Sequence, residues 1–138
     1  MRRQLTLLRH AKSSWDDAKL KDRDRPLNER GERDAPLMGK RLRARGARPT
    51  LIITSPAVRA RQTAHIVAVL ARQDRSFKDV LVCGHNPGLT DLANRLTGAE
   101  IDNIPTTGVV VIGLDLKDWA DLTGAQGELL MFDYPKRG

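Results

Sequence analysis

Arginine and histidine stand in this sequence where apolar runs end. Arg9 and His10 follow the run "QLTLL", and His85 follows "DVLVC" after one glycine. Arg59 lies shortly after a third run, "TLIIT". A guanidinium is a permanent planar cation that matches phosphate oxygens, and a neutral imidazole can attack phosphorus. These residues together predict a site for a phosphoryl group, with one histidine as nucleophile and the other groups stabilising the phosphate oxygens.

The three apolar runs are interpreted as strands of a parallel sheet. They cover residues 4–8, 50–54 and 79–83. Leucine-rich and β-branched runs bounded by turn residues are typical of strands buried on both faces. Ligands of open α/β sheets bind outside the carboxyl ends of the strands. The two arginines and two histidines are therefore expected to meet at one edge of the sheet.

Helix signals accompany these strands. Ser55 with Pro56, and Asn86 with Pro87, each predict an N-cap followed by proline at the first helical position. The apolar stripe of the first helix would be Val58, Ile66, Val69 and Leu70, and that of the second Leu89, Leu92, Ala93 and Leu96. Another helix is predicted from residue 28 to about 45, with Gly46 ending it and an inward face of Ala35, Met38 and Leu42.

The carboxyl-terminal part predicts two more strands, at residues 106–114 and 127–134, with a helical turn near residues 115–122. The order is βαβα with extra strands at the end. The fold class is therefore α/β: a three-layer sandwich with a mostly parallel central sheet flanked by helices. Residues 1–138 are expected to form a single domain.

The composition limits the classes of binding partner that can be expected. The net charge of +7 allows an anionic partner, but acids and bases alternate in the most charged segments, which is typical of a solvated helix face. Few aromatic residues are present, so binding of nucleic acid is not expected. No apolar run approaches the roughly 18 residues of a membrane span, and the apolar start is too short for a signal peptide. With Cys83 as the single cysteine, we expect a cytoplasmic protein without membrane attachment.

The sequence lacks the residues that several other kinds of catalytic site need. The sequence has no phosphate-loop motif, no G-x-S-x-G elbow and no H-E-x-x-H zinc helix. Cysteine phosphatases need an arginine six residues after the cysteine, where this sequence has Leu89, so Cys83 is expected to be a buried strand residue. His65, inside the second helix, is expected to pack or face solvent. No carboxylates show metal-ligand spacing, so we expect a metal-independent site without a cofactor.

Four motifs in order resemble the histidine phosphatase superfamily, which has the phosphoglycerate mutase-like fold: "LLRHAKSSW", "RPLNERG", "TSPAVRARQTA" and "GHNPGLTDLA". They are most similar to its small SixA-type branch of phosphohistidine phosphatases. The resemblance implies that His10 is the phosphorylated nucleophile and His85 the second pocket histidine. It also implies that Arg9 and Arg59 bind phosphate. Arg25, in the second motif, would be a basic residue on the substrate side or part of a loop salt bridge.

Two features depart from that family. The nucleophile motif reads R-H-A where most members read R-H-G, although alanine suits the small branch. Near residues 72–76, members usually carry an additional strand and helix, often with the acid that protonates the leaving group. Either this chain lacks the acid or a segment is missing from the sequence, and the abrupt connection favours the second. Asp16, Asp17 and Asp74 are candidate acids by position only, and each is expected to be a solvated surface carboxylate.

The expected substrate follows from the leaving group. An alkoxide needs a proton in the transition state, whereas an imidazole leaves phosphorus more readily. A site that is poor in acids and has no inserted segments to cover it is open to a protein side chain. The expected substrate is therefore protein phosphohistidine, and the expected intermediate is a phosphorylated histidine of the enzyme. A general phosphomonoesterase for small phosphorylated metabolites is the alternative enzyme. A non-catalytic phosphate-binding module is the alternative outside enzymes, although it would not need His10.

Overall fold

The structure is a computed structural model that describes residues 2–9, 29–46, 49–54 and 63–137. Five strands in this part of the chain form one sheet: β1 (Arg2–Arg9), β2 (Leu51–Thr54), β3 (Asp79–Gly84), β4 (Val109–Asp115) and β5 (Glu128–Asp133). The helices in these ranges are α1 (Glu29–Ala44), α2 (Thr63–Ala71), α3 (Gly88–Thr97) and two short 3-10 turns, η3 (Trp119–Leu122) and η4 (Pro135–Arg137). No helix in the described ranges is both long and apolar enough to cross a membrane.

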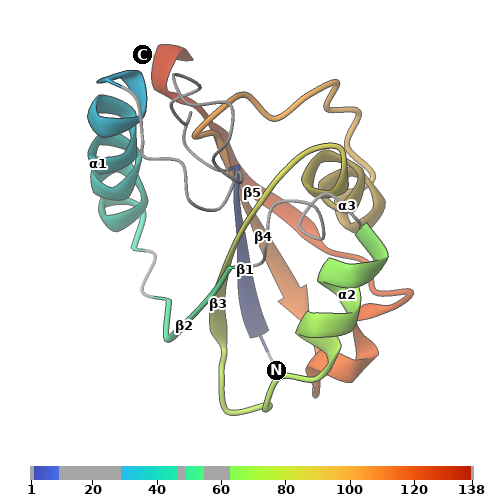
Figure 1. Cartoon of the computed structure of the whole chain (residues 1–138). Coiled ribbons are helices and arrows are strands. Elements are labelled where there is room, and N and C mark those ends of the chain that lie inside the picture. Colours follow the sequence, from blue (N-terminus) through green and yellow to red (C-terminus); the bar gives the residue numbers. More distant parts are fainter. Residues whose placement is uncertain (1, 10–28, 47–48, 55–62, 138) are drawn as a thin grey trace, which may run out of the picture.

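The sheet is mixed, with strand order β2-β3-β1-β4-β5 (Figure 1). The strands predicted from the three apolar runs are confirmed as a parallel group, because β3 pairs in parallel with both β1 and β2. Of the two carboxyl-terminal strands, β4 runs antiparallel to β1, and β5 runs antiparallel to β4 and so points in the same direction as β1. The predicted α/β fold is confirmed, and the parallel group contains the edge at which the site is expected.

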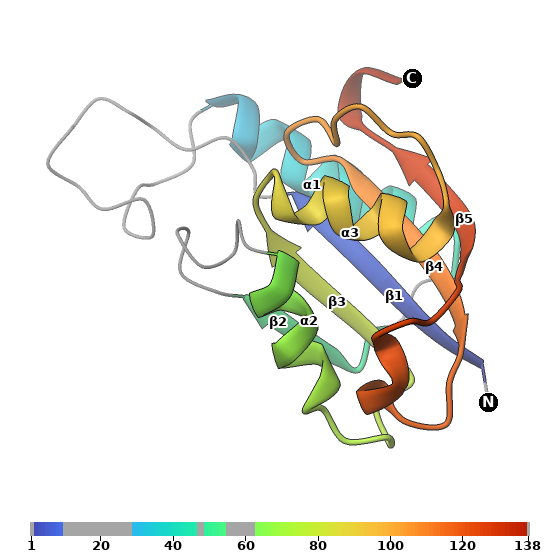
Figure 2. The same ribbon diagram turned by 90° about the vertical axis from the view of Figure 1, so that its right-hand side faces the viewer.

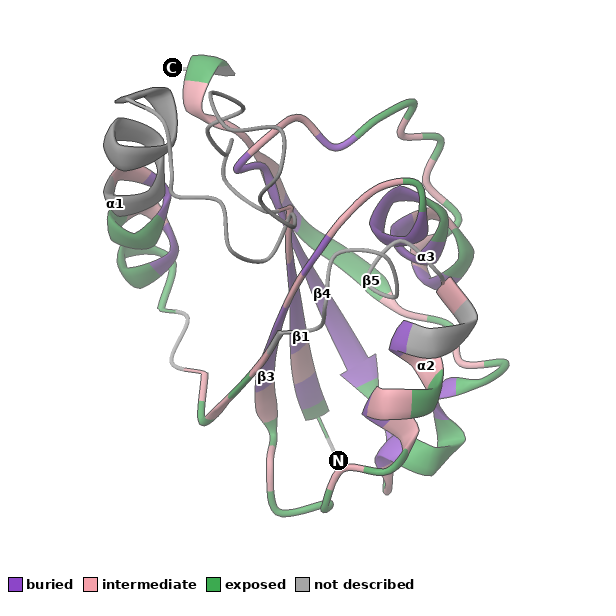
Figure 3. Ribbon diagram, viewed as in Figure 1, coloured by how far each residue is buried: buried purple, intermediate pink, exposed green. Residues whose placement is uncertain are grey.

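Helices cover both faces of the sheet, as the three-layer prediction requires (Figures 1 and 2). On one face α2, α3 and η3 pack over Leu5, Leu7, Val80 and Val82. On the other face α1 places Met38 and Leu42 against residues such as Leu81, Val109, Val111 and Met131. Buried residues therefore alternate between the two faces along the strands (Figure 3). Burial on both faces explains why these strands read as continuous apolar runs.

The predicted helices are confirmed where the structure describes them. Gly46 follows α1 with a φ of +82°, a left-handed conformation that glycine adopts readily. The expected inward residues of α3, namely Leu89, Leu92, Ala93 and Leu96, are all buried. Ile66 and Leu70 of α2 are also buried. The predicted helix start at Ser55 and Pro56, with Val58, lies outside the described residues, as does the side chain of Ala35.

The start of α3 differs from the prediction by one position. The N-cap position is Pro87, not Asn86, and proline has no side-chain group that could cap the helix. The Asn86 side chain still serves the helix end, because its Oδ1 accepts a hydrogen bond from the backbone N–H of Thr90 at 3.2 Å. The sequence therefore identified the capping side chain but not its place relative to the helix.

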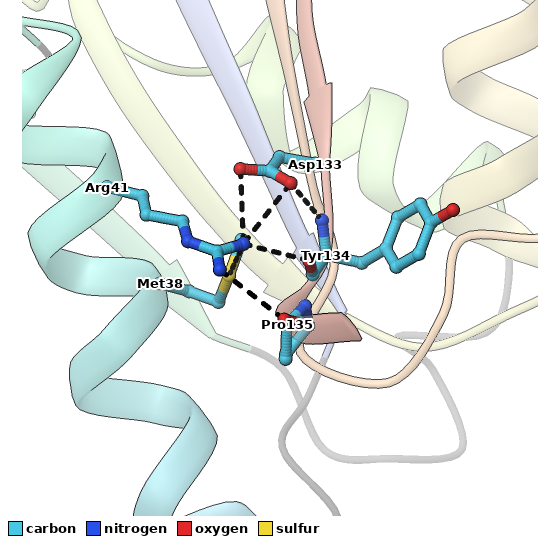
Figure 4. A network of polar contacts seen from close by, with 5 residues as sticks. All are labelled: Met38, Arg41, Asp133, Tyr134 and Pro135. Atoms are coloured by element: carbon cyan, nitrogen blue, oxygen red, sulfur yellow. Dashed lines mark hydrogen bonds and ion pairs between the residues drawn. The ribbon is translucent and has the colours of Figure 1, made fainter. Parts of the chain in front are cut away.

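Arg41 attaches α1 to the end of β5 (Figure 4). Its Nη1 lies 3.3 Å from both carboxylate oxygens of Asp133 and donates to the carbonyl oxygen of Tyr134 at 2.9 Å. The partly buried ion pair is shielded from much of the solvent on both sides. The contact holds α1 and the segment after β5 together on the same face of the sheet.

Candidate active site

The register of the sheet places Arg9 and His85 at one edge. The Cα partner of Arg9 in the parallel pairing of β1 and β3 is Gly84, and His85 is the next residue. Both strands end here, so the predicted convergence is confirmed for this pair. His10, Arg25 and Arg59, together with Asp16 and Asp17, lie outside the described residues.

The guanidinium of Arg9 is held by a backbone oxygen. Its Nη1 donates to the carbonyl oxygen of Ile104 at 2.8 Å, and the backbone N–H of Arg9 donates to the carbonyl of Gly108 at 2.9 Å. Partial burial lowers the pKa of Arg9 from its usual value, yet arginine stays protonated near neutral pH. Among the described residues, Ile104 accepts from only one nitrogen of this group. The guanidinium can therefore also donate to an anion.

His85 joins the end of β3 to the start of α3. The residue is half-buried, and its carbonyl oxygen accepts from the backbone N–H of Leu89 at 3.2 Å. A helix amino terminus carries partial positive charge and unpaired N–H groups, both of which favour a bound anion. Arg9 and this helix end thus bring positive potential to the same edge as His85.

The loop of residues 103–108 contacts Arg9 through its backbone carbonyls and is tightly constrained. The backbone N–H of Gly108 donates to the carbonyl oxygen of Pro105 at 2.8 Å. Thr107 has a φ of +62°, which is uncommon for a β-branched residue. Its side chain is 2% exposed, and its hydroxyl has no hydrogen-bond partner among the described residues. Strained, buried residues of this kind persist only where the surrounding structure holds them.

Gly108 permits the shape of this loop. A Cβ atom there would lie 2.7 Å from the Pro105 carbonyl oxygen and 3.0 Å from Cγ2 of Ile104. We expect Gly108→Ala to lower the free energy of unfolding by about 1–3 kcal/mol, the usual cost of forcing extra atoms into a packed site. Urea unfolding monitored by circular dichroism measures this effect.

The matched control is Gly39→Ala on α1, because a Cβ atom at Gly39 would meet nothing within 4 Å. Alanine suits a helix interior better than glycine, so this variant should be as stable as the wild type or up to ~1 kcal/mol more stable. Equal stability of Gly108→Ala and the wild type would show that the loop can adopt another shape.

Cys83 does not have the properties of a nucleophile. It lies on β3 among residues that pack against α1, and burial raises the pKa of its thiol to about 11. At pH 8 we expect a disulfide reagent to label it roughly 10²-fold more slowly than a free thiol, because the thiolate is the reactive form. Cys83→Ala should keep full activity towards a phosphorylated substrate. Fast labelling, or activity lost in a variant that remains folded, would contradict this reading.

Asp74 lies at the wrong end of the sheet to act at the site. It belongs to the connection of residues 72–78, which joins α2 to the amino end of β3, whereas Arg9 and His85 follow the carboxyl ends. The backbone N–H of Ser76 donates to its carboxylate at 2.8 Å and lowers the pKa of Asp74. This acid is exposed and ionised, as expected for a surface carboxylate.

Two polar side chains make contacts near the site that were not predicted: Asn86, expected only as a helix cap, and Thr90. Asn86 and Thr90 both hydrogen-bond to the backbone of Ile104, the residue that accepts from Arg9. The local signal was their spacing of four residues, which places both side chains on one side of a helix start. Their common partner is distant in the sequence, so their connection to Arg9 required the tertiary structure.

Known proteins share this arrangement of elements. The sequence profile of the histidine phosphatase superfamily (branch 1) matches residues 5–74. A chloroplast protein of Arabidopsis thaliana, itself uncharacterized, is 32% identical over 133 residues, which is 72% of this chain and 61% of that protein. The chain thus spans less than two thirds of the length of that relative.

Two solved structures show how widely the fold is used. The candidate phosphohistidine phosphatase SixA of Nakamurella multipartitia superposes with a TM-score of 0.82 at 23% identity, covering 99% of this chain and 98% of that chain. A mycobacterial glucosyl-3-phosphoglycerate phosphatase has a TM-score of 0.68 at 13% identity, covering 96% and 100%. Together with the profile match and the edge that joins Arg9 to His85, they show that this chain belongs to branch 1 of the histidine phosphatase superfamily and has its phosphoglycerate mutase-like fold.

Proposed function

We propose that this protein is a phosphatase that cleaves phosphohistidine in other proteins through a phosphorylated His10. The observation that carries the proposal is the parallel pairing of β1 with β3. It places Arg9 and His85 together at the carboxyl ends of these strands, and His10 is the next residue after Arg9 in the sequence. Arg59, which lies outside the described residues, is proposed as the second phosphate-binding arginine and Arg25 as a substrate-side residue.

The reaction has two steps. An unprotonated ring nitrogen of His10 attacks phosphorus, the bond from phosphorus to the substrate imidazole breaks, and that imidazole leaves with the bonding electron pair and takes up a proton from water. A water molecule then attacks the phosphorus of phospho-His10, loses a proton to solvent, and releases inorganic phosphate and free His10. Arg9, Arg59 and His85 stabilise the negative charge on the three phosphoryl oxygens in both steps.

Phosphohistidine is preferred over an ester of an alcohol because the ester would need a general acid to protonate its leaving group. Cleavage of an ester of an alcohol gains roughly 10²–10⁴-fold from a positioned acid. Asp74, the candidate acid that the structure describes, is at the opposite edge of the sheet, and the connection at residues 72–78 is short. A phosphorylated imidazole is the substrate whose cleavage depends least on such an acid.

Phosphate release from a phosphohistidine-bearing phosphotransfer protein, measured in the presence of a chelator, tests the function. The same enzyme preparation is also assayed on a phosphoserine peptide and on p-nitrophenyl phosphate. We expect metal-free release from phosphohistidine with a kcat/KM at least ~10²-fold above that for the phosphoserine peptide, which is the lower range of the contribution of a general acid. No release from phosphohistidine would refute the assignment.

A general phosphomonoesterase is the second candidate, because the mycobacterial phosphatase that acts on glucosyl-3-phosphoglycerate shares this fold. Faster release from small phosphate esters than from phosphohistidine would favour that activity. Phosphate binding without release from any of the three substrates would favour a binding module.

A further inference from the structure

Asn86 and Thr90, at the start of α3, form a closed set of hydrogen bonds with Ile104 in the loop after the helix. The N–H of Ile104 donates to Oγ1 of Thr90 at 3.0 Å, and this hydroxyl donates to Oδ1 of Asn86 at 2.7 Å. Nδ2 of Asn86 in turn donates to the carbonyl oxygen of Ile104 at 3.1 Å. Both backbone polar groups of Ile104 are therefore engaged by side chains that lie next to His85.

The carbonyl oxygen of Ile104 is shared with the phosphate-binding arginine. It accepts from Nη1 of Arg9 at 2.8 Å as well as from Asn86. An sp² oxygen has two lone-pair directions, so it can accept both bonds. One backbone oxygen thus links β1, which carries Arg9, to the segment that begins with His85.

Burial makes this link rigid. Thr90 is 6% exposed and Ile104 is fully buried, so water does not compete freely for these groups. Asn86 also donates to Oδ1 of Asn103 at 2.7 Å, which adds a second attachment to the same loop. The tight turn at Gly108 and the strained Thr107 constrain the loop from its other end.

We propose that Thr90 and Asn86 are positioning residues that set the orientation of Arg9 relative to His85 through the Ile104 carbonyl. Side chains held by such outer contacts lose less freedom when a ligand binds, so the pocket binds phosphate more tightly. The inference rests on the proposed phosphate pocket, but it concerns the alignment of that pocket and not the identity of the substrate.

Thr90→Val is the principal test, because valine has nearly the same shape and removes only the hydroxyl. We expect the dissociation constant for inorganic phosphate, measured by titration calorimetry, to rise about tenfold, and kcat/KM for the best substrate to fall in parallel. Thr90→Ser, which keeps the hydroxyl, should restore both values to within about twofold of the wild type. Asn86→Ser, which shortens the side chain, should weaken phosphate binding as Thr90→Val does.

Asn94 offers a matched control further along the same helix. Its Nδ2 donates to the carbonyl of Ile101 at 2.8 Å and its Oδ1 accepts from the N–H of Ile101 at 2.9 Å, so it ties α3 to the same connection. Asn94→Ser should lower the melting temperature as Asn86→Ser does and leave phosphate affinity unchanged.

The outcomes separate this inference from the proposed function. Unchanged phosphate affinity in Thr90→Val, or an equal loss in Asn94→Ser, overturns the positioning role. If Thr90→Val does not fold, the comparison of Asn86→Ser with Asn94→Ser decides. A wild-type protein that binds no phosphate overturns both the pocket and the inference, whereas binding without turnover overturns the proposed function alone.

Discussion

His10→Ala is expected to reduce phosphate release from the best substrate by roughly 10⁴-fold or more, the loss typical of removing an enzyme nucleophile. The physical reason is that the two-step reaction has no acceptor for the phosphoryl group without the imidazole of His10. The measurement is single-turnover release from a radiolabelled phosphohistidine protein. An alkaline quench preserves phosphohistidine, so label bound to the enzyme can be counted in the same samples.

His65→Ala is the control for this experiment. The sequence holds three histidines, and His65 lies within α2, whereas His85 directly follows β3 and His10 directly follows Arg9 in the sequence. This variant should keep wild-type turnover and wild-type labelling. Labelling that persists in His10→Ala and disappears in His85→Ala would instead make His85 the nucleophile.

Arg3→Met is expected to lower the stability of the fold strongly without changing a residue of the site. The Arg3 side chain is 1% exposed and donates to four carbonyl oxygens, those of Leu116 (3.1 Å), Arg75 (2.7 Å), Phe77 (3.1 Å) and Lys117 (2.8 Å). Its Cζ also lies 5.6 Å from the ring centroid of Trp119. Arg3 therefore joins the turn before β3 to the turn after β4.

Methionine fills much of the same volume but cannot donate. Each buried carbonyl left without a partner costs about 1–3 kcal/mol, although water entering the turns offsets part of that cost. We expect the free energy of unfolding to fall by about 3–5 kcal/mol, which lowers the melting temperature by roughly 10–20 °C for a domain of this size. Differential scanning calorimetry measures both quantities.

The neighbouring Arg2→Met is the matched control. Arg2 pairs with Glu128 at 2.7 Å, but the two side chains are 58% and 67% exposed. Exposed ion pairs contribute about 0–1 kcal/mol, so this variant should melt close to the wild type. Folded Arg3→Met should keep its kcat/KM at low temperature, because Arg3 and Arg9 lie at opposite ends of β1. Equal melting temperatures for the two variants would show that the buried hydrogen bonds of Arg3 contribute little.

The elements could be predicted because their signals are local. Residues 79–83 read as a strand from their own apolar run, and Pro87 and Gly46 mark helix boundaries from their own backbone preferences. The position of Arg9 beside His85 also followed, since parallel strands place their carboxyl ends at one edge, and the register of β1 with β3 confirms it.

Other roles depended on partners that no local pattern reveals. Arg2 and Arg3 are adjacent and identical in type, yet one is exposed and the other is buried against carbonyls 72 to 114 positions away in the sequence. Asn86 reads as a helix cap, while its contact with Ile104 becomes visible only when α3 and the following loop are packed together. The mixed character of the sheet likewise follows from where β4 and β5 pair.

By itself, then, the sequence determined the order of strands and helices, the family, and the edge at which the phosphate chemistry is expected, because these depend on residue types and short spacings. The tertiary structure alone decided which of the adjacent Arg2 and Arg3 is buried and hydrogen-bonded to distant carbonyl oxygens. It also decided that Asp74 is remote and that one carbonyl oxygen links Arg9 to Asn86. Hydrogen bonds between distant segments form, and their side chains become buried, only when the chain packs. Local residue patterns therefore do not predict these contacts.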